Sequence, residues 1–276
     1  MPEEVSPVGS HERWTALLDI LGRQGRLEVA AVAAELGVSL ATIRRDLDHL
    51  AEQQLLTRTR GGAAAASIAY DLPLRHKSSR FAQQKARIGA AAAALIPAGS
   101  VVGLNGGTTT SQVARALVTR APGDTPDNEP DDGPDDGIAF TIVTNALNIA
   151  NDLAVRRSVK LVVTGGVARP RSYELLGPLA EPTLVRVHLD YAVLGVDGFD
   201  LRVGATADHE GEAAVTAQMV ARADHVILVA DSSKLNRTSF ARVCTAAAVG
   251  TLVTDTDADP VFLEAVRAAG IDVTVA

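Results

Sequence analysis

The sequence predicts a small, mostly α-helical domain that ends in a β-hairpin, followed by a larger α/β domain with a mostly parallel sheet. The chain has 276 residues, a length that is comfortable for two domains. Residues 11–66 carry apolar side chains at helical spacing. From Ile88 onward, short β-rich runs alternate with helical stretches, which is the pattern of a parallel sheet covered by helices.

Composition favours a soluble protein of the cytoplasm. Hydrophobic residues make up 47% of the chain and aromatic residues only 3%, so its cores are aliphatic. The single cysteine, Cys244, allows no internal disulfide, as is usual in a reducing cytosol. The start, MPEEVSPVGSHERW, has no basic segment followed by an apolar one, so no signal peptide is expected. No apolar run approaches the roughly 20 residues that cross a membrane, and we expect no membrane partner.

Shifts in composition and charge set the expected boundaries. We assign residues 11–66 to the first domain, 67–87 to a basic linker and 88–276 to the second domain. An acidic loop at 119–137 is expected to be disordered, because its Pro, Gly and acidic residues cannot bury enough apolar surface to offset their ordering entropy. That loop holds seven acidic residues against one basic residue, whereas residues 58–87 hold seven basic residues against one acidic residue. Such asymmetry favours a region that faces nucleic acid, although both segments could be solvated surface.

Three helices are expected within residues 11–66. The first carries its apolar residues at helical spacing: Trp14, Leu17, Leu18 and Leu21. The second is EVAAVAAELG, with Gly37 as its stop, and Ser39 is a good N-cap for the third.

The third helix has an apolar stripe and a basic face. Ile43, Leu47 and Leu50 lie at i, i+4 and i+7 and should be buried, with Arg45 opposite them. A short helix, a tight turn and a helix with an exposed basic N-terminal half form a helix-turn-helix, whose last helix fits the major groove of DNA. The residues expected to face DNA from this helix are Ser39, Thr42, Arg44, Arg45 and His49.

The segment LLTRTRGG suits a small hairpin, or wing, that places Arg58 and Arg60 near phosphates. The alternative is a solvated helix face on which Arg44 and Arg45 pair with acidic neighbours. Those neighbours are Asp46, Asp48 and Glu52. Helix, turn, helix and wing occur together within about 50 residues, which favours DNA binding.

The stretch RLEVAAVAAELGVSLATIRRDLDHLAEQQLLTRTRGGA resembles the N-terminal winged helix-turn-helix of the DeoR family of bacterial transcriptional regulators. The motif is VSxxTIRRDLxxL followed by RxxGGA, and this sequence departs from the family at His49, Ala51, Gln53 and Gln54. The resemblance implies a DNA-binding repressor whose second domain senses a sugar phosphate.

The second domain carries an anion-binding pattern of its own. In VVGLNGGTTTSQVARAL, a strand leads through small residues into a helix that begins near Ser111. Backbone N–H groups, hydroxyls and the helix dipole at such a start favour a phosphate, although the stretch could be a plain strand–helix turn. No Gly-Lys-Thr follows, which argues against a nucleoside triphosphatase.

Other strand ends add polar groups, and ligands of open α/β sheets bind at these carboxyl ends. Each group taken alone could be a capped turn or a surface lysine, but together they favour a small anionic ligand. The expected effector-binding residues are Asn105, Gly106, Gly107, Thr108, Thr109, Thr110, Thr144, Asn145, Gly165, Gly166, Asp197, Gly198 and Lys234.

The segments GGTTT, VTNALNIA, TGG, GVDGFD, GATADHEGEAAV and ADSSKLNRTSF resemble, in order, the effector domain of DeoR regulators. The resemblance implies a fold similar to ribose-5-phosphate isomerase. Asn105 stands where the family often has aspartate, and the acidic loop is an insertion.

An isomerase-like enzyme is a second hypothesis, because several carboxylates and Lys234 could support acid–base chemistry. The carboxylates are Asp197, Asp200, Asp208, Glu210 and Glu212. A dimerisation module without a ligand is a third. We favour a sugar-phosphate-responsive repressor with no catalytic residue, metal or cofactor, acting on double-stranded DNA as a homodimer or homotetramer.

Overall fold

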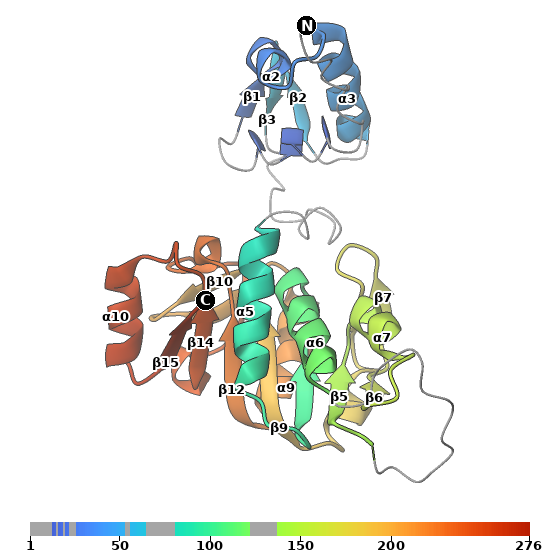
Figure 1. Cartoon of the computed structure of the whole chain (residues 1–276), viewed down its shortest axis with the longest axis vertical. Helices are drawn as coiled ribbons and strands as arrows, with labels where there is room; N and C mark the ends of the chain where they lie inside the picture. The colour runs from blue at the N-terminus through green and yellow to red at the C-terminus, as the bar shows by residue number, and fades with distance from the viewer. Residues whose placement is uncertain are drawn as a thin grey trace, which may run out of the picture. The chain divides into compact units, whose positions relative to one another are not determined.

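The computed structural model describes residues 13–14, 16–18, 20–21, 26–52, 56–64, 81–121 and 137–276. The chain divides into two compact units, Met1–Arg80 and Phe81–Ala276. Figure 1 shows both, with the first unit in blue. No helix in the described ranges combines the length and the apolar character needed to cross a bilayer.

The first unit combines helices with a three-stranded antiparallel sheet. The described residues between positions 13 and 21 are helical. The elements that follow are β1 (Arg26–Glu28), α2 (Val29–Glu35), α3 (Leu40–Glu52), β2 (Thr57–Thr59) and β3 (Gly62–Ala64), and the sheet order is β1-β3-β2. Gly37 has a φ of +64°, which is the left-handed conformation expected of a residue that ends a helix. The three predicted helices and the hairpin are confirmed.

One boundary in this unit was predicted wrongly. Glu28 was expected in the second helix but belongs to β1, where it pairs with Gly62. The pairing brings the two backbones so close that a Cβ on Gly62 would lie 1.9 Å from the carbonyl oxygen of Leu27. Long-range pairing to the hairpin therefore overrides the local helical pattern.

The core of the first unit is aliphatic. Ile43, Leu47 and Leu50 of α3 are fully buried and pack with Leu17 of the N-terminal helix and Val32 of α2. The predicted stripe is confirmed, and its burial leaves the other face of α3 to solvent.

The second unit is built on a seven-stranded sheet in which every pairing is parallel. The strands, in their order across the sheet, are β15 (Asp272–Val275), β14 (Thr251–Thr254), β12 (Ala223–Val229), β9 (Leu189–Gly195), β4 (Val101–Leu104), β5 (Phe140–Thr144) and β6 (Val159–Val163). The predicted parallel α/β architecture is confirmed.

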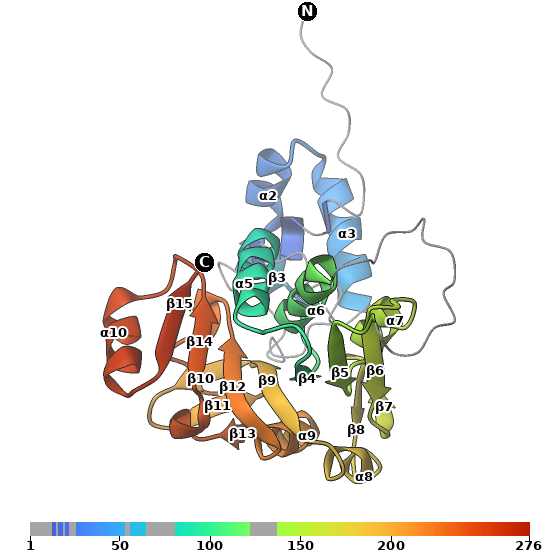
Figure 2. The ribbon, with the colours of Figure 1, turned by 60° about the horizontal axis from the view of Figure 1, so that its bottom comes forward.

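Helices cover both faces of this sheet, as Figures 1 and 2 show. One face carries α5 (Ala82–Ala94), α6 (Thr108–Arg120) and α7 (Leu147–Leu153), and the other carries α9 (Glu210–Val220). Successive residues of β9 face opposite cores: Val193 packs with α5 and α6, whereas Ala192 and Leu194 pack with α9. Because both faces are covered, the strands read as apolar runs.

The strand order places the reversal of the chain between β4 and β9. From β4 the chain runs through β5 to β6 at one edge, then returns to β9 beside β4 and continues to β15 at the other edge. Ligands of such sheets bind outside the carboxyl ends of the strands at this switch point.

Smaller elements decorate the sheet. They are the hairpin β7 (Val167–Arg169) and β8 (Glu174–Leu176), α8 (Glu181–Leu184), the antiparallel strands β10 (Gly198–Asp200), β11 (Gly204–Ala207) and β13 (Ala241–Cys244), the short 3-10 helices η1 (Ser232–Lys234) and η2 (Ala246–Ala248), and α10 (Pro260–Ala268).

Two expected boundaries differ at the ends of helices. The linker was expected to run to Arg87, but residues 82–87 form the first turns of α5, whose Lys85 and Ile88 are buried. The acidic loop was expected from Thr119, but Thr119 and Arg120 end α6. The disorder expected for the rest of that loop concerns residues 122–136, which lie outside the described residues, as do linker residues 67–80.

Candidate DNA interface and effector site

The start of α3 is set by Ser39. Its Oγ accepts the backbone N–H of Thr42 at 3.1 Å and lies 2.8 Å from Oγ1 of Thr42. The N-cap prediction is therefore confirmed. The two hydroxyls engage each other, so their expected contacts with DNA stay a prediction.

Arg44 and Arg45 are exposed on α3. Within the described part of the chain, neither forms an ion pair, because the nearby acids have other partners. Asp46 accepts Nε of Arg13 at 2.9 Å, and Asp48 accepts Nε of Arg58 at 2.8 Å. Asp46 and Asp48 therefore do not neutralise the two arginines, whose guanidinium groups are available for DNA. The side chain of Glu52, the third acid of that alternative, lies outside the described residues.

His49 has a partner within the first unit, and its expected contact with DNA stays a prediction. Its ring stacks on the indole of Trp14 with centroids 4.3 Å apart, and Trp14 donates its Nε1–H to Asp46 at 2.8 Å. His49 thus packs within the first unit and is only half exposed. Asp46 is the buried centre of this group, since it also receives Arg13.

Arg58 of the wing is held by the protein. Its Nε donates to Asp48 of α3 and its Nη1 donates to the carbonyl oxygen of Gly62 at 2.7 Å. It therefore ties the wing to α3, whereas it was expected to lie near phosphates. Arg60 is exposed at the hairpin turn, next to Gly61, whose φ is +86°.

Asn105 follows β4 at the switch point and bonds to the end of β9. Its Nδ2 donates to the carbonyl oxygen of Gly195 and its Oδ1 accepts the N–H of Gly195, both at 2.9 Å. Nδ2 also donates to Oγ1 of Thr216 at 3.3 Å. The amide is buried and committed to the backbone, so a direct contact with an effector would require it to give up these bonds.

The loop after β4 leads into α6 at Gly107. Gly107 has a φ of +147°, and its carbonyl oxygen accepts the hydroxyls of Thr110 at 3.0 Å and Ser111 at 2.7 Å. Those two hydroxyls therefore donate their protons to the carbonyl group of the N-cap residue. Thr108 is half exposed, and the first N–H groups of a helix have no intrahelical acceptor. The expected contacts of an anion with these N–H groups and with Thr108 and the buried Thr109 stay a prediction.

The end of β5 contributes Thr144 and Asn145, both fully buried. Oγ1 of Thr144 donates to the carbonyl oxygen of Leu104 at 2.7 Å, which ties β5 to β4. Nδ2 of Asn145 donates to Oε1 of Glu174 at 3.2 Å, whereas its Oδ1 has no partner among the described residues. Thr144 is therefore structural, and Asn145 keeps an acceptor.

Glu174 of β8 was not predicted as a site residue. Its Oε1 accepts the N–H of Gly106 at 2.9 Å, and its side chain packs so closely that a Cβ on Gly106 would lie 2.3 Å from its Cγ. Burial, reinforced by the carboxylate of Glu212, raises the pKa of Glu174 to about 8. Arg169 donates to Glu212 at 3.0 Å. The N–H of Gly106 therefore already donates to a buried carboxyl group.

The raised pKa of Glu174 predicts that stability falls as the pH rises from acid to mildly alkaline values. The folded pKa of about 8 lies above the ordinary 4.5, so stability is fully present below about pH 4.5 and is lost as the pH rises toward 8. Glu174→Gln cannot ionise and should melt several degrees above the wild type at pH 9, but close to it at pH 5. Calorimetry at both pH values tests this, with the exposed Glu264→Gln as control. If the difference in melting temperature between Glu174→Gln and the wild type did not increase with pH, this prediction would be contradicted.

Asp197 and Lys234 meet at the same carboxyl edge of the sheet. Nζ of Lys234, in η1, lies 3.3 Å from Oδ1 of Asp197, which follows β9. Oδ2 of Asp197 accepts the N–H of Asp208 at 3.1 Å. The lysine therefore lies beside the end of β9, and the carboxylate of Asp197 partly neutralises its positive charge.

The remaining glycines of the predicted site serve close packing. A Cβ on Gly165 would lie 2.3 Å from the carbonyl oxygen of Leu179, and one on Gly198 would lie 2.6 Å from that of Arg237. Gly166 has a φ of +140° beside Leu175. These contacts explain the glycines without a ligand, so their effector contacts stay a prediction.

The candidate acid–base carboxylates are spread over separate local structures. Asp200 accepts the N–H groups of Arg202 and Val203 in the β10–β11 turn. Glu212 is bound by Arg169, and Glu210 is exposed. No two of them form a pair in the described residues, as an acid–base mechanism would favour.

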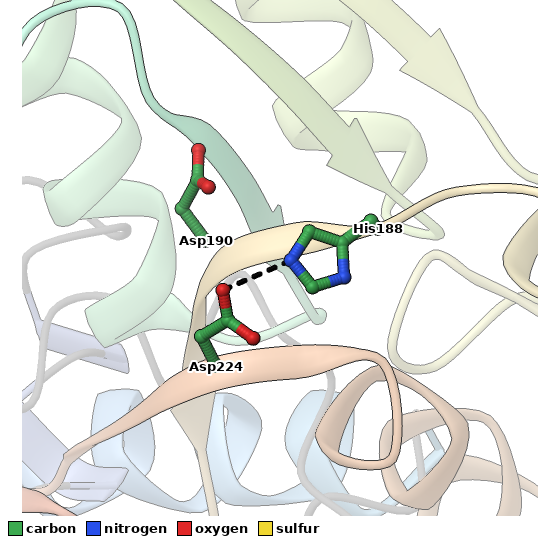
Figure 3. Close-up of side chains that lie close together, drawn as sticks. All are labelled: His188, Asp190 and Asp224. Atoms are coloured by element: carbon green, nitrogen blue, oxygen red, sulfur yellow. Dashed lines mark hydrogen bonds and ion pairs between the residues drawn. The ribbon is translucent and has the colours of Figure 1, made fainter.

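A separate cluster lies at the amino edge of the sheet, where Figure 3 shows His188, Asp190 and Asp224. One ligand atom from each lies within 4.8 Å of the others. Nε2 of His188 lies 2.9 Å from Oδ2 of Asp224, and Oδ2 of Asp190 accepts the N–H of Val101 at 2.7 Å. These contacts account for the cluster as a surface hydrogen-bonded pair beside a strand end that Asp190 caps, and we assign no metal to it.

Comparison with known proteins agrees with both units. Residues 13–69 match the family model described as DeoR-like helix-turn-helix domain, and residues 134–256 match that described as DeoR C terminal sensor domain. A solved structure of ribose 5-phosphate isomerase A from Methanocaldococcus jannaschii aligns over 56% of this chain and 55% of its own, with a TM-score of 0.39 and 17% identity.

Full-length relatives are named as regulators. The chain is 33% identical to a putative aga operon transcriptional repressor of Escherichia coli O157:H7, over 96% of this chain and 93% of that protein. It is 29% identical to the glycerol-3-phosphate regulon repressor of Escherichia coli K12, over 88% and 90%. These relatives are regulators and not enzymes, which speaks against the isomerase hypothesis. The chain belongs to the DeoR family of transcriptional regulators.

Proposed function

We propose that this protein is a repressor that binds operator DNA through α3 and the wing, and that a phosphorylated sugar bound at the β4–α6 loop modulates this binding. One arrangement carries the proposal: exposed arginines on a capped recognition helix in one unit, and an anion-binding loop at the switch point of a parallel sheet in the other. The relative that represses a glycerol-3-phosphate regulon supports a phosphorylated effector.

The DNA half of the proposal depends on Arg45. It lies on the face of α3 opposite the buried Ile43 and Leu47, so it points to the groove when the helix docks. A guanidinium group can bind guanine through two hydrogen bonds or a phosphate through its charge. Arg44, on the flank, and Arg60, at the hairpin turn, add contacts to the backbone.

Arg45→Ala should weaken operator binding by about 1–3 kcal/mol while the fold stays intact. Fluorescence anisotropy with an operator selected from random DNA measures the affinity, and Trp14 fluorescence monitors the fold. Arg222→Ala, an exposed arginine of the second unit, is the matched control. Unchanged affinity at moderate salt would remove Arg45 from the interface.

The effector half depends on the start of α6. A phosphate there would accept backbone N–H groups at the positive end of the helix and a charge-assisted bond from Lys234. Oδ1 of Asn145, which has no partner among the residues that the structure describes, can accept a hydrogen bond from a sugar hydroxyl. Neutral sugars lack the phosphate and should bind far more weakly.

A melting-shift panel tests the effector half. Triose, pentose and hexose phosphates, glycerol 3-phosphate and inorganic phosphate are compared with unphosphorylated sugars. A compound that binds the folded protein stabilises it by about 2.7 kcal/mol at 100 times its Kd. An operator gel shift with the stabilising compounds then tests modulation, and turnover of the same compounds would signal an enzyme. No shift with any phosphorylated compound would overturn this half.

We further propose that the first unit binds DNA and the second unit binds the effector, in a homodimer or homotetramer in the cytoplasm. Operators with two-fold symmetry are read by symmetric oligomers, which favours an even number of recognition helices. Sedimentation of the full chain, with and without operator, tests the assembly.

A further inference from the structure

Glu174 lies where the proposed effector would bind. It belongs to β8, in the hairpin that follows β6, yet its carboxyl reaches the loop after β4. Its Oε1 accepts both the N–H of Gly106 and Nδ2 of Asn145. The protein's own acid therefore holds the first N–H of the loop that was expected to receive a phosphate.

The charged side chain that shifts the pKa of Glu174 is Glu212, whose carboxylate raises it. The loops after β4 and β5, to which it bonds, carry no charged residue. The titratable side chains on the other elements packed against it are Arg169 and Arg171 of its own hairpin, and His209, Glu210 and Glu212 of α9. Arg169 is its cross-strand partner but donates to Glu212, and His209 accepts the N–H of Gly211. Glu174 thus faces a second carboxylate from within the protein.

An ionised Glu174 would repel a phosphate dianion, because like charges a few ångströms apart in a buried site cost free energy. A neutral carboxylic acid would instead accept the N–H of Gly106 through one oxygen and offer an O–H to the anion through the other. The pKa of about 8 makes the neutral acid the main form at pH 7.

We infer that Glu174 is a specificity-determining residue of the effector site, which admits the phosphate only while its own carboxyl is protonated, so that binding is linked to proton uptake. This inference rests on the proposed function. The inference adds a condition for binding that the loop alone does not set. The site should bind a phosphate dianion most tightly, and only when Glu174 carries a proton.

The matched variant is Glu174→Gln. Glutamine has the shape of the neutral acid, and its Oε1 can keep the bonds from Gly106 and Asn145 while its amide takes the place of the O–H. Glu212→Gln is the second variant, because it removes the neighbouring carboxylate and should lower the pH at which Glu174 ionises. Glu264→Gln, exposed on α10, controls for loss of one carboxyl.

Titration calorimetry with glycerol 3-phosphate and with the most stabilising sugar phosphate of the panel tests the inference between pH 7.5 and 9.5. A phosphate monoester is a dianion throughout this range, since its second pKa is about 6. The wild type should lose affinity about tenfold per pH unit above pH 8, and comparison of buffers with different ionisation heats should show uptake of about one proton. Glu174→Gln should bind with little pH dependence, and Glu212→Gln should lose affinity at lower pH than the wild type.

Other results would overturn the inference. Wild-type affinity that stays constant to pH 9.5 would show that the anion tolerates an ionised Glu174. Affinity that Glu174→Gln loses equally at every pH would show that the carboxylate accepts a bond from the sugar. In both cases the proposed function stands, because a phosphorylated sugar still binds. Absence of binding by wild type and variants alike would overturn the proposed function and this inference with it.

Discussion

Asp46→Ala should destabilise the first unit by about 1–3 kcal/mol, the range seen when a buried acceptor is removed from its hydrogen-bond donors. Asp46 is buried and accepts Arg13 and Trp14. Its loss removes the carboxylate that Arg13 and Trp14 both donate to, and so loosens the stack of Trp14 on His49. Chemical denaturation followed by Trp14 fluorescence measures the effect, because Trp14 is the only tryptophan of the chain.

Two further variants test the cause of this loss. Asp46→Asn keeps an acceptor for the indole N–H but loses the charge, so it should lie between wild type and alanine. Glu35→Ala, exposed on α2, should change stability by less than about 0.5 kcal/mol. Equal stability of wild type and Asp46→Ala would show that the buried carboxylate contributes little.

Lys234→Ala should weaken binding of the effector phosphate by about 2–3 kcal/mol, or roughly 30- to 150-fold, and leave operator binding unchanged without effector. The loss has two sources, because the variant removes a cation and also leaves the carboxylate of Asp197 without its ammonium partner. The repressor should then stay on its operator at effector concentrations that release the wild type.

The double variant Lys234→Ala with Asp197→Asn separates the two sources. Neutralising Asp197 should recover part of the affinity if its negative charge, no longer paired with Lys234, repels the phosphate. Titration calorimetry beside an operator gel shift measures both functions. If Lys234→Ala binds the effector as tightly as the wild type, the lysine does not contact the phosphate.

The elements that periodicity defines were predicted well. The stripe Ile43, Leu47 and Leu50 and the N-cap Ser39 were identified from local spacing, and the parallel sheet from alternation of strands and helices. The strand β1 was missed, since its pairing with Gly62 depends on residues far along the chain. Local patterns predict elements, whereas pairing decides their ends.

The contacts at the candidate sites could be predicted from local patterns even less well than the ends of the elements. Sequence placed Gly106, Gly107 and Lys234 at strand ends, which is where the structure has them. It could not show that Arg58 binds Asp48, that the amide of Asn105 is committed to Gly195, or that Lys234 lies beside Asp197. Side-chain partners depend on tertiary approach, and residue type alone predicts only the capacity to bond.

Glu174 had no signal in the sequence that would have selected it. It begins the segment ELLGPLA, which follows a turn. A charged residue at the start of such a short strand is expected to be exposed. Only the hairpin brings it against Gly106 and gives it Glu212 as a neighbour. A buried acid created by long-range packing is therefore found from the structure.

The bonds of Arg58 to Asp48 and Gly62 have a consequence for how an operator is chosen. The distance and angle between the wing and the recognition helix are already set in the free protein, so little rotamer entropy remains to be lost there on DNA binding. If the groove of a half-site does not match the fixed spacing of wing and helix, the DNA must bend or its groove must widen. The free energy of that deformation then lowers the binding affinity, and it is larger for stiffer DNA. Base pairs that no side chain touches should therefore affect binding through the deformability of the duplex.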